Sequence, residues 1–191
     1  MSPTRADGGG AGEPARLVLG LGNLLLGDDA VGLELLALFE DEGPIDGCDV
    51  TLEFVDGGTQ GLALLGVMSE RRAMLVLDAV QLGAAPGTVH VLTGEEALAL
   101  RFQRPETSHE GGAGQLLAIA QLSGDLPARV MVVGVEPARV ETHVGLSDPV
   151  RAALPTALRR ARLAVECLVA ADTGPRSPAA GAPQRTAPCT S

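Results

Sequence analysis

The residues of this chain whose side chains are best suited to catalysis or metal binding are carboxylates that follow predicted strands. Asp28 and Asp29 come soon after the first apolar strand. Asp56 follows the second strand, and Asp78 directly follows the third. His109 lies further along, in a polar stretch. Carboxylate oxygens together with an imidazole nitrogen suit a divalent transition metal, and such a set leaves coordination positions open for a substrate.

Each of these residues also has a purely structural interpretation. Asp28 and Asp29 could cap the following helix or complement its dipole. Asp78 could be an ordinary turn residue, although a carboxylate beside a buried strand costs free energy unless it is used. A histidine such as His109 in a polar loop is by default solvated.

Two further histidines are weaker candidates. His90 alternates with Val89 and Val91, which predicts that its side chain faces solvent. His143 follows an acidic residue and a threonine, and it is a second-rank candidate for the site.

Apolar periodicity alternates between strand and helix along most of the chain. Continuous or alternating apolar runs predict strands, and apolar residues at helical spacing predict helices. The predicted strands are 17–21, 50–54, 73–77, 87–93 and 129–135, and the second runs into a predicted turn at 56–58. One helix is predicted to begin near Val31, and three more are predicted at 61–69, 113–122 and 149–171.

These elements predict an α/β fold. The link between strands 73–77 and 87–93 is too short for a crossover helix, so the later strand is expected to run antiparallel. The result is a single domain with a mixed, mostly parallel, five-stranded twisted sheet and helices on both faces. In such open sheets, sites form beyond the carboxyl ends of the parallel strands, where the acidic residues fall.

The two ends of the chain differ in composition from its centre. Residues 1–15 are rich in glycine, and residues 172–191 are rich in proline and alanine, with little to bury in either segment. We expect a disordered N-terminal extension and a disordered C-terminal tail around a folded domain at 16–171.

Composition and charge exclude several classes of partner. Apolar residues make up 46% of the 191 residues, which is enough for a folded core. The net charge is −10 and basic runs are absent, so we expect neither a nucleic-acid partner nor binding to an anionic membrane. The three Phe and the lack of Trp and Tyr leave no aromatic platform for stacking bases.

The sequence shows no sign of a membrane span, a secretory signal or a cysteine-based site. No apolar run approaches the roughly 20 residues of a membrane span, and the N-terminal segment has no apolar centre typical of a secretory signal. The three cysteines are far apart and predict neither a disulfide framework nor a zinc site. We therefore expect a cytoplasmic protein.

Six sequence blocks occur together and in order. They are GLGNLLLGDDAVG (20–32), FVDGGTQGLALL (54–65), LVLDAV (75–80), APGTV (85–89), SH (108–109) and VVGVEPARVETHVGLS (132–147). Together these blocks resemble the maturation endopeptidases of nickel–iron hydrogenases. The resemblance covers essentially all of residues 16–171 and makes this segment the maturation endopeptidase domain.

The resemblance implies a hydrolase, namely a protease that removes the C-terminal peptide of a hydrogenase large-subunit precursor after nickel insertion. The family's metal-contacting and catalytic positions fall on Asp29, Asp78 and His109, and the first of these is Glu or Asp across the family. The nickel is expected to arrive with the precursor. Asp56 and the Gly57-Gly58 turn are expected to shape the neighbouring substrate cleft.

Two mechanisms stay open for such a metal-binding site. The nickel in the precursor could be the recognition element, with Asp29, Asp78 and His109 completing its coordination and so docking the scissile bond. The metal could instead also polarise the carbonyl or activate a water, with a carboxylate as base.

Two other functions compete with the protease. One is a non-catalytic, nickel-dependent docking factor or chaperone for the large subunit. The other is a dinucleotide-binding oxidoreductase, since Gly20 and Gly22 open like a dinucleotide fingerprint, but Leu25 stands where that motif needs its third glycine.

Overall fold

Five strands form one sheet in the spatial order β2-β1-β3-β5-β4. Strand β1 is parallel to both β2 and β3, and β3 is parallel to β5, whereas β4 is antiparallel to β5. The mixed, mostly parallel five-stranded sheet predicted from the sequence is therefore confirmed, including the direction of its one antiparallel strand. The bounds are β1 Arg16–Leu21, β2 Leu52–Gly58, β3 Ala73–Ala79, β4 Val89–Thr93 and β5 Arg129–Val135.

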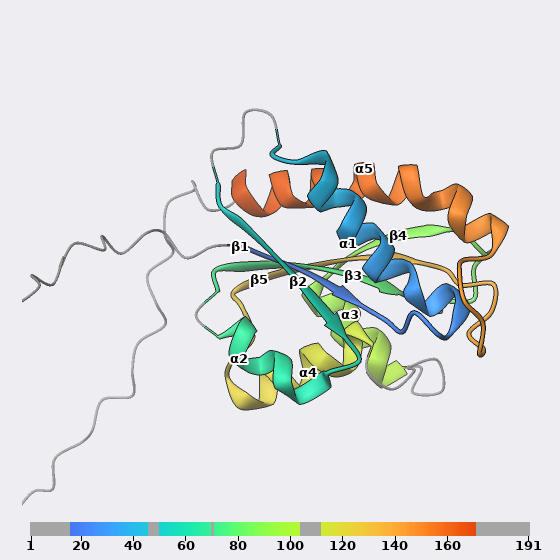
Figure 1. Cartoon of the computed structure of the whole chain (residues 1–191). Helices are drawn as coiled ribbons and strands as arrows, with labels where there is room; N and C mark the ends of the chain where they lie inside the picture. The colour runs from blue at the N-terminus through green and yellow to red at the C-terminus, as the bar shows by residue number, and fades with distance from the viewer. Residues whose placement is uncertain (1–15, 46–49, 70, 104–111, 171–191) are drawn as a thin grey trace, which may run out of the picture.

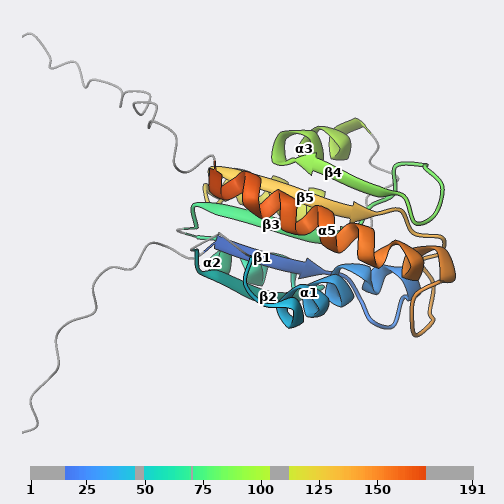
Figure 2. The same ribbon diagram turned by 90° about the horizontal axis from the view of Figure 1, so that it is seen from above.

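The computed structural model describes residues 16–45, 50–69, 71–103 and 112–170. The predicted extensions at 1–15 and 172–191 lie outside the described residues. Seen from above, the strands lie side by side with β2 and β4 at the two edges (Figure 2). No helix in the described ranges is long and apolar enough to cross a membrane.

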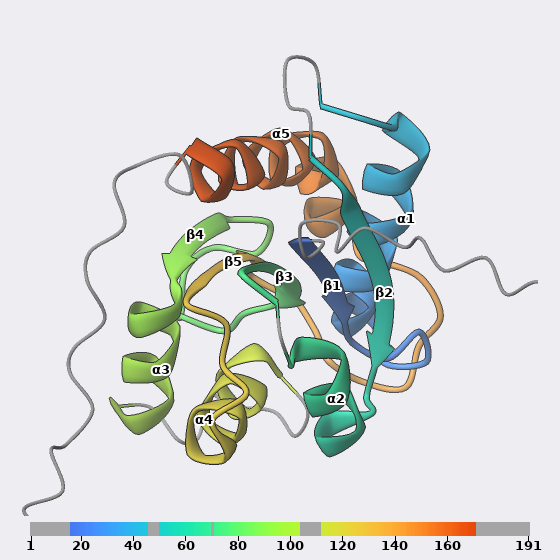
Figure 3. The same ribbon diagram turned by 90° about the vertical axis from the view of Figure 1, so that its left-hand side faces the viewer.

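Helices cover both faces of the sheet. Helices α1 and α5 lie on one face, and η2, α2, α3 and α4 lie on the other, as the view along the strands shows (Figure 3). The bounds are η1 Gly27–Ala30, α1 Val31–Glu42, η2 Gly61–Leu64, α2 Leu65–Met68, α3 Gly94–Gln103, α4 Ala113–Ser123 and α5 Asp148–Ala170.

The alternation of side chains along the central strands divides the core into two layers. Leu75 and Leu77 of β3 pack in the cluster under α1 and α5, whereas Met74 and Val76 pack in the cluster against α2 and α4. Because both faces are covered, every residue of β1 and β3 is buried. This explains why these strands read as continuous apolar runs.

Two elements differ from the expectation. Strand β2 continues through the predicted turn, because Asp56 still pairs with Gly20, and Gly58 pairs with Leu21 after a bulge. Helix α3 was not predicted at all. Its start carries a capping box, in which the Thr93 N–H donates to Glu96 Oε2 at 2.8 Å and the Glu96 N–H donates to Thr93 Oγ1 at 3.2 Å.

Helix α1 begins directly over the ends of the two central strands (Figure 1). A Cβ atom at Gly32 would overlap the carbonyl oxygens of Leu21, which ends β1, and of Leu77 in β3. A Cβ at Gly20 would in turn lie 2.8 Å from the Gly32 carbonyl oxygen. These glycines therefore let the first turn of α1 sit against the carboxyl edge of the sheet, where the strand order reverses.

We predict that Gly32→Ala lowers the free energy of unfolding by about 3 kcal/mol, because the added methyl group meets backbone that cannot move without shifting two strands. Far-UV circular dichroism during urea denaturation measures this, since the chain has no Trp or Tyr to report by fluorescence. Gly66→Ala is the matched control, because a Cβ at this helical glycine meets nothing within 4 Å. Equal stability of the two variants would contradict the close-packing argument.

Candidate active site at the carboxyl edge of the sheet

A cleft of about 690 Å³ opens beyond the carboxyl end of the sheet. The loop after β1 contributes Asn23, Leu26 and Asp29 to its walls, helix α4 contributes Gln115, and the segment after β5 contributes Val140. The strand order reverses at β1, since β2 lies on one side of it and β3 on the other. This is the switch point at which open α/β sheets bind their ligands.

Asp29 is the acidic residue that lines this cleft. It lies in the short 3-10 helix η1 and is only 5% exposed. Its Oδ2 accepts a hydrogen bond from the Asn23 N–H at 2.8 Å. The Asn23 side chain in turn accepts the Leu25 N–H at 2.9 Å, so the loop after β1 is folded around the carboxylate. A main-chain donor thus fixes the orientation of Asp29 at the cleft wall.

Asp78 lies one residue before the end of β3 and is 2% exposed. Its Oδ1 accepts the Ala79 N–H at 2.9 Å, and its Oδ2 accepts the Ala113 N–H at 2.7 Å. Ala113 is the first residue of α4, where a negative charge is favourable for the helix dipole.

Asp28 has a different role from its neighbour. It is completely buried, and Oδ2 accepts the N–H groups of Ala138 and Arg139 at 2.9 and 3.1 Å. Ser147 donates its N–H to Oδ1 at 2.6 Å and its hydroxyl to Oδ2 at 2.8 Å. Burial by itself raises the pKa of this carboxyl, but the bonds from Ser147, Ala138 and Arg139 outweigh it and hold the pKa below its ordinary value.

The partners of Asp28 belong to the segment after β5, which lies against the loop after β1. The Gly27 N–H donates to the His143 carbonyl at 2.7 Å, and the His143 N–H donates to the Leu25 carbonyl at 2.9 Å. Helix capping does not explain Asp28 or Asp29, since no side-chain bond caps η1 or α1. Asp28 instead joins two segments that are more than 100 residues apart in the sequence.

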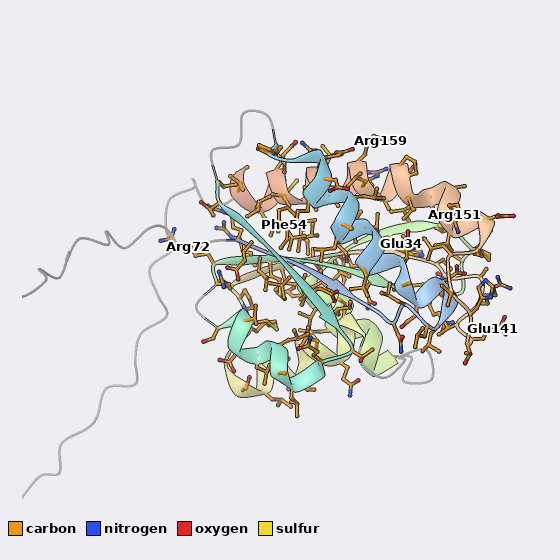
Figure 4. All side chains as sticks on the ribbon, viewed as in Figure 1. Glu34, Phe54, Arg72, Glu141, Arg151 and Arg159 are labelled. Carbon is orange, nitrogen blue, oxygen red and sulfur yellow. The ribbon has the colours of Figure 1, made fainter. Side chains whose placement is uncertain are left out.

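His143 contributes its main chain, not its side chain, to this region. Its imidazole is exposed, and the residues that line the cleft do not include it. The neighbouring Glu141 marks this end of the sheet in Figure 4, and Arg72, just before β3, marks the opposite end.

The segment predicted as a substrate-binding turn is the bulged end of β2, and it lies beside the cleft. Asp56 is exposed, and its Oδ1 accepts the Gly58 N–H at 2.9 Å. Gly57 is buried, and a Cβ there would lie 2.9 Å from the side chains of Leu19 and Leu21. The cleft wall begins just after the turn, at Thr59. A role for Asp56, Gly57 and Gly58 in binding substrate stays a prediction.

His109 lies outside the described residues. Within the parts of the chain that the structure describes, no three His, Cys, Asp or Glu side chains are grouped so that they could hold a metal ion. The predicted set of Asp29, Asp78 and His109 therefore stays a prediction, of which two members are placed at the carboxyl ends of β1 and β3.

The buried carboxylate of Glu136 was not predicted from the sequence. Glu136 follows β5, is 4% exposed, and accepts the Leu82 and Gly83 N–H groups at 2.9 and 2.8 Å. His90 Nε2 lies 3.0 Å from Glu136 Oε2, so the expectation that His90 faces solvent is wrong. Glu136 thus fixes the position of the segment between β3 and β4 through hydrogen bonds to its main chain. Glu136 directly follows the predicted strand 129–135, as Asp78 follows the predicted strand 73–77, and this position could have indicated a buried carboxylate.

The protein is an open α/β sheet with a cleft at its switch point, and Asp29 lines this cleft. Because this fold class hosts many functions, comparison with known proteins is needed to define the family. The family model described as "Hydrogenase maturation protease" matches residues 34–162. The hydrogenase 2 maturation protease of Escherichia coli strain K12 is 37% identical over 145 residues, which cover 75% of this chain and 86% of the relative.

Solved structures agree with the family model. The hydrogenase maturating endopeptidase HybD from E. coli matches with a TM-score of 0.68 and 35% identity, over 80% of this chain and 92% of the other. The hydrogenase 2 maturation peptidase from a Thaumarchaeota archaeon matches with a TM-score of 0.55 and 29% identity, over 81% and 97%. The chain belongs to the hydrogenase maturation protease family, and it is an endopeptidase.

We predict that Asp28→Ala lowers the free energy of unfolding by about 3 kcal/mol, because it leaves several buried donors on the segment after β5 without their acceptor. Asp28→Asn keeps one acceptor oxygen and should lose less. Urea denaturation followed by circular dichroism measures both. Asp41→Ala, at an exposed position of α1, is the control. A loss for Asp28→Ala no larger than that of the control would contradict the anchoring role.

Proposed function

We propose that this endopeptidase removes the C-terminal peptide from the precursor of a nickel–iron hydrogenase large subunit after nickel has been inserted. The observation that carries the proposal is the pair of oriented carboxylates, Asp29 in the cleft wall and Asp78 at the end of the adjacent strand. The relatives named as hydrogenase maturation proteases support the same substrate.

The nickel in this proposal is part of the substrate, because it enters the cleft with the precursor. Asp29, Asp78 and His109 would hold it, and their oxygen and nitrogen donors suit a divalent transition metal. The backbone N–H groups that contact Asp29 and Asp78 support this, since ligand carboxylates are commonly oriented by such bonds. His109 precedes Ala113, the donor to Asp78, by four residues, a chain length of at most about 14 Å.

The chain's own residues would then position the scissile bond. A metal fixed at three protein ligands places the adjoining peptide in the cleft, and positioning of this kind supplies a large part of a rate acceleration. The bound metal would supply Lewis acidity toward a carbonyl or a water, and a carboxylate not engaged as a ligand could accept a proton. The cytoplasmic location expected from the sequence stays a prediction.

Intact mass spectrometry of a nickel-loaded large-subunit precursor tests the proposal. We expect the loss of one discrete C-terminal peptide, only with nickel in the precursor and only with active enzyme. Asp29→Asn, Asp78→Asn and His109→Ala should each slow processing about 100-fold or more, because even residues that support metal ligands commonly matter 10- to 100-fold. Asp41→Asn, on the exposed part of α1, is the matched control and should process normally.

The same experiment separates the competing functions. A precursor that binds the enzyme but keeps its full mass would contradict the proposal and favour a docking factor. Cleavage that is equally fast without nickel would contradict the part of the proposal that concerns the metal.

Asp56 provides a separate test of the turn beside the cleft. We predict that Asp56→Ala slows processing about tenfold while nickel-loaded precursor still binds, because the bond from the Gly58 N–H to Asp56 Oδ1 is lost and the turn loosens. Asp56→Asn keeps an acceptor at this position and should restore most of the rate. If Asp56→Ala processes as fast as the unmodified enzyme, the turn has no part in substrate binding.

A further inference from the structure

Exposed apolar side chains gather around the cleft. Leu24, Leu25, Leu62 and Val144 are 54%, 62%, 65% and 75% exposed. They come from three segments that are distant in the sequence: the loop after β1, the helix η2, and the segment after β5. We call these four residues the apolar rim.

Chain position and main-chain hydrogen bonds place the rim beside the cleft. Leu62 itself lines the cleft. Leu24 and Leu25 lie between Asn23 and Leu26, which both line it.

Val144 belongs to the same region through its chain neighbour. The main chain of His143 pairs with Leu25 and Gly27, so the segment carrying Val144 runs beside the loop after β1. Three separate segments thus present large apolar side chains to solvent around one opening.

The remaining exposed apolar side chains of the described residues are different. Each lies on a different element: Leu38 on α1, Val91 on β4, Leu122 near the end of α4 and Leu163 on α5. Single exposed apolar residues are common on protein surfaces and need no explanation. A group of them around a functional opening is typical of an interaction site.

We propose that the apolar rim is the surface on which the hydrogenase large-subunit precursor docks, through an apolar face next to its C-terminal segment. This inference rests on the proposed function. A peptidase can cut only when its protein substrate covers the cleft, and Leu62 is part of the cleft wall. The rim is therefore continuous with the surface that the substrate must cover.

The charges around the rim fit the same partner. Asp29 lies inside the cleft, and the exposed Asp56 and Glu141 flank it, with Arg139 paired to Glu141 at 3.7 Å. An opening with negative charge at its centre and apolar side chains around it complements a bound cation within an apolar face. An apolar surface with charged residues at its edge is typical of a protein–protein interface, in which a few contact residues carry most of the binding energy.

Steady-state processing kinetics with nickel-loaded precursor test the rim. We expect Leu24→Ser, Leu25→Ser and Val144→Ser each to raise KM about tenfold with kcat within about twofold, because contact residues of this kind act on binding. Leu25→Met keeps a large apolar side chain, so its KM should stay close to that of the unmodified enzyme. Leu163→Ser, at an exposed leucine of α5 on the other face of the sheet from α4, is the matched control and should leave KM unchanged. Circular dichroism checks that each variant is folded.

The outcomes distinguish the rim from the function on which it rests. Failure of the unmodified enzyme to cut any nickel-loaded precursor would reject the proposed function. Normal cutting together with unchanged KM in all three folded rim variants would overturn the rim alone. The rim is also overturned if the control variant raises KM as much as the rim variants, or if kcat falls while KM stays constant.

Discussion

The buried carboxylate of Asp28 is the interaction on which the carboxyl edge of this protein depends. It accepts bonds from Ala138, Arg139 and Ser147, and so joins the segment after β5 to the loop after β1. Both segments contribute to the cleft, through Val140 on one side and Asn23, Leu26 and Asp29 on the other. A charged group without such donors would be costly to bury, and the depressed pKa of Asp28 reflects how fully the donors compensate.

Neighbouring carboxylates at this edge differ because of the donors that face them. Asp28 is surrounded by donors from a distant segment and acts as an anchor. Asp29, one residue later, accepts the N–H of Asn23 in the loop after β1 and lines the cleft. Asp78 accepts the first N–H of α4 and so ties that helix to the end of β3. The close approach at Gly32 brings the start of α1 against β1 and β3 at the switch point.

Much of the fold follows from sequence periodicity, because strands covered on both faces are continuously apolar. Strand β5 was predicted with its observed bounds for this reason. Helix α3 was missed because its apolar pattern is weak, although Thr93 and Glu96 form a capping box at its start. Asp29 and Asp78 were predicted at the correct edge. The partners of Asp28 and the contact between His90 and Glu136 depend on residues far apart in the chain, which periodicity does not reveal.

We propose that the enzyme recognises the nickel of its substrate through Asp29, Asp78 and His109. Nickel X-ray absorption of the loaded precursor, alone and mixed with excess enzyme and frozen before cleavage is complete, tests it most directly. We expect additional oxygen and nitrogen neighbours on the nickel in the mixture, and their loss with Asp29→Ala. An identical nickel environment with and without bound enzyme would contradict it.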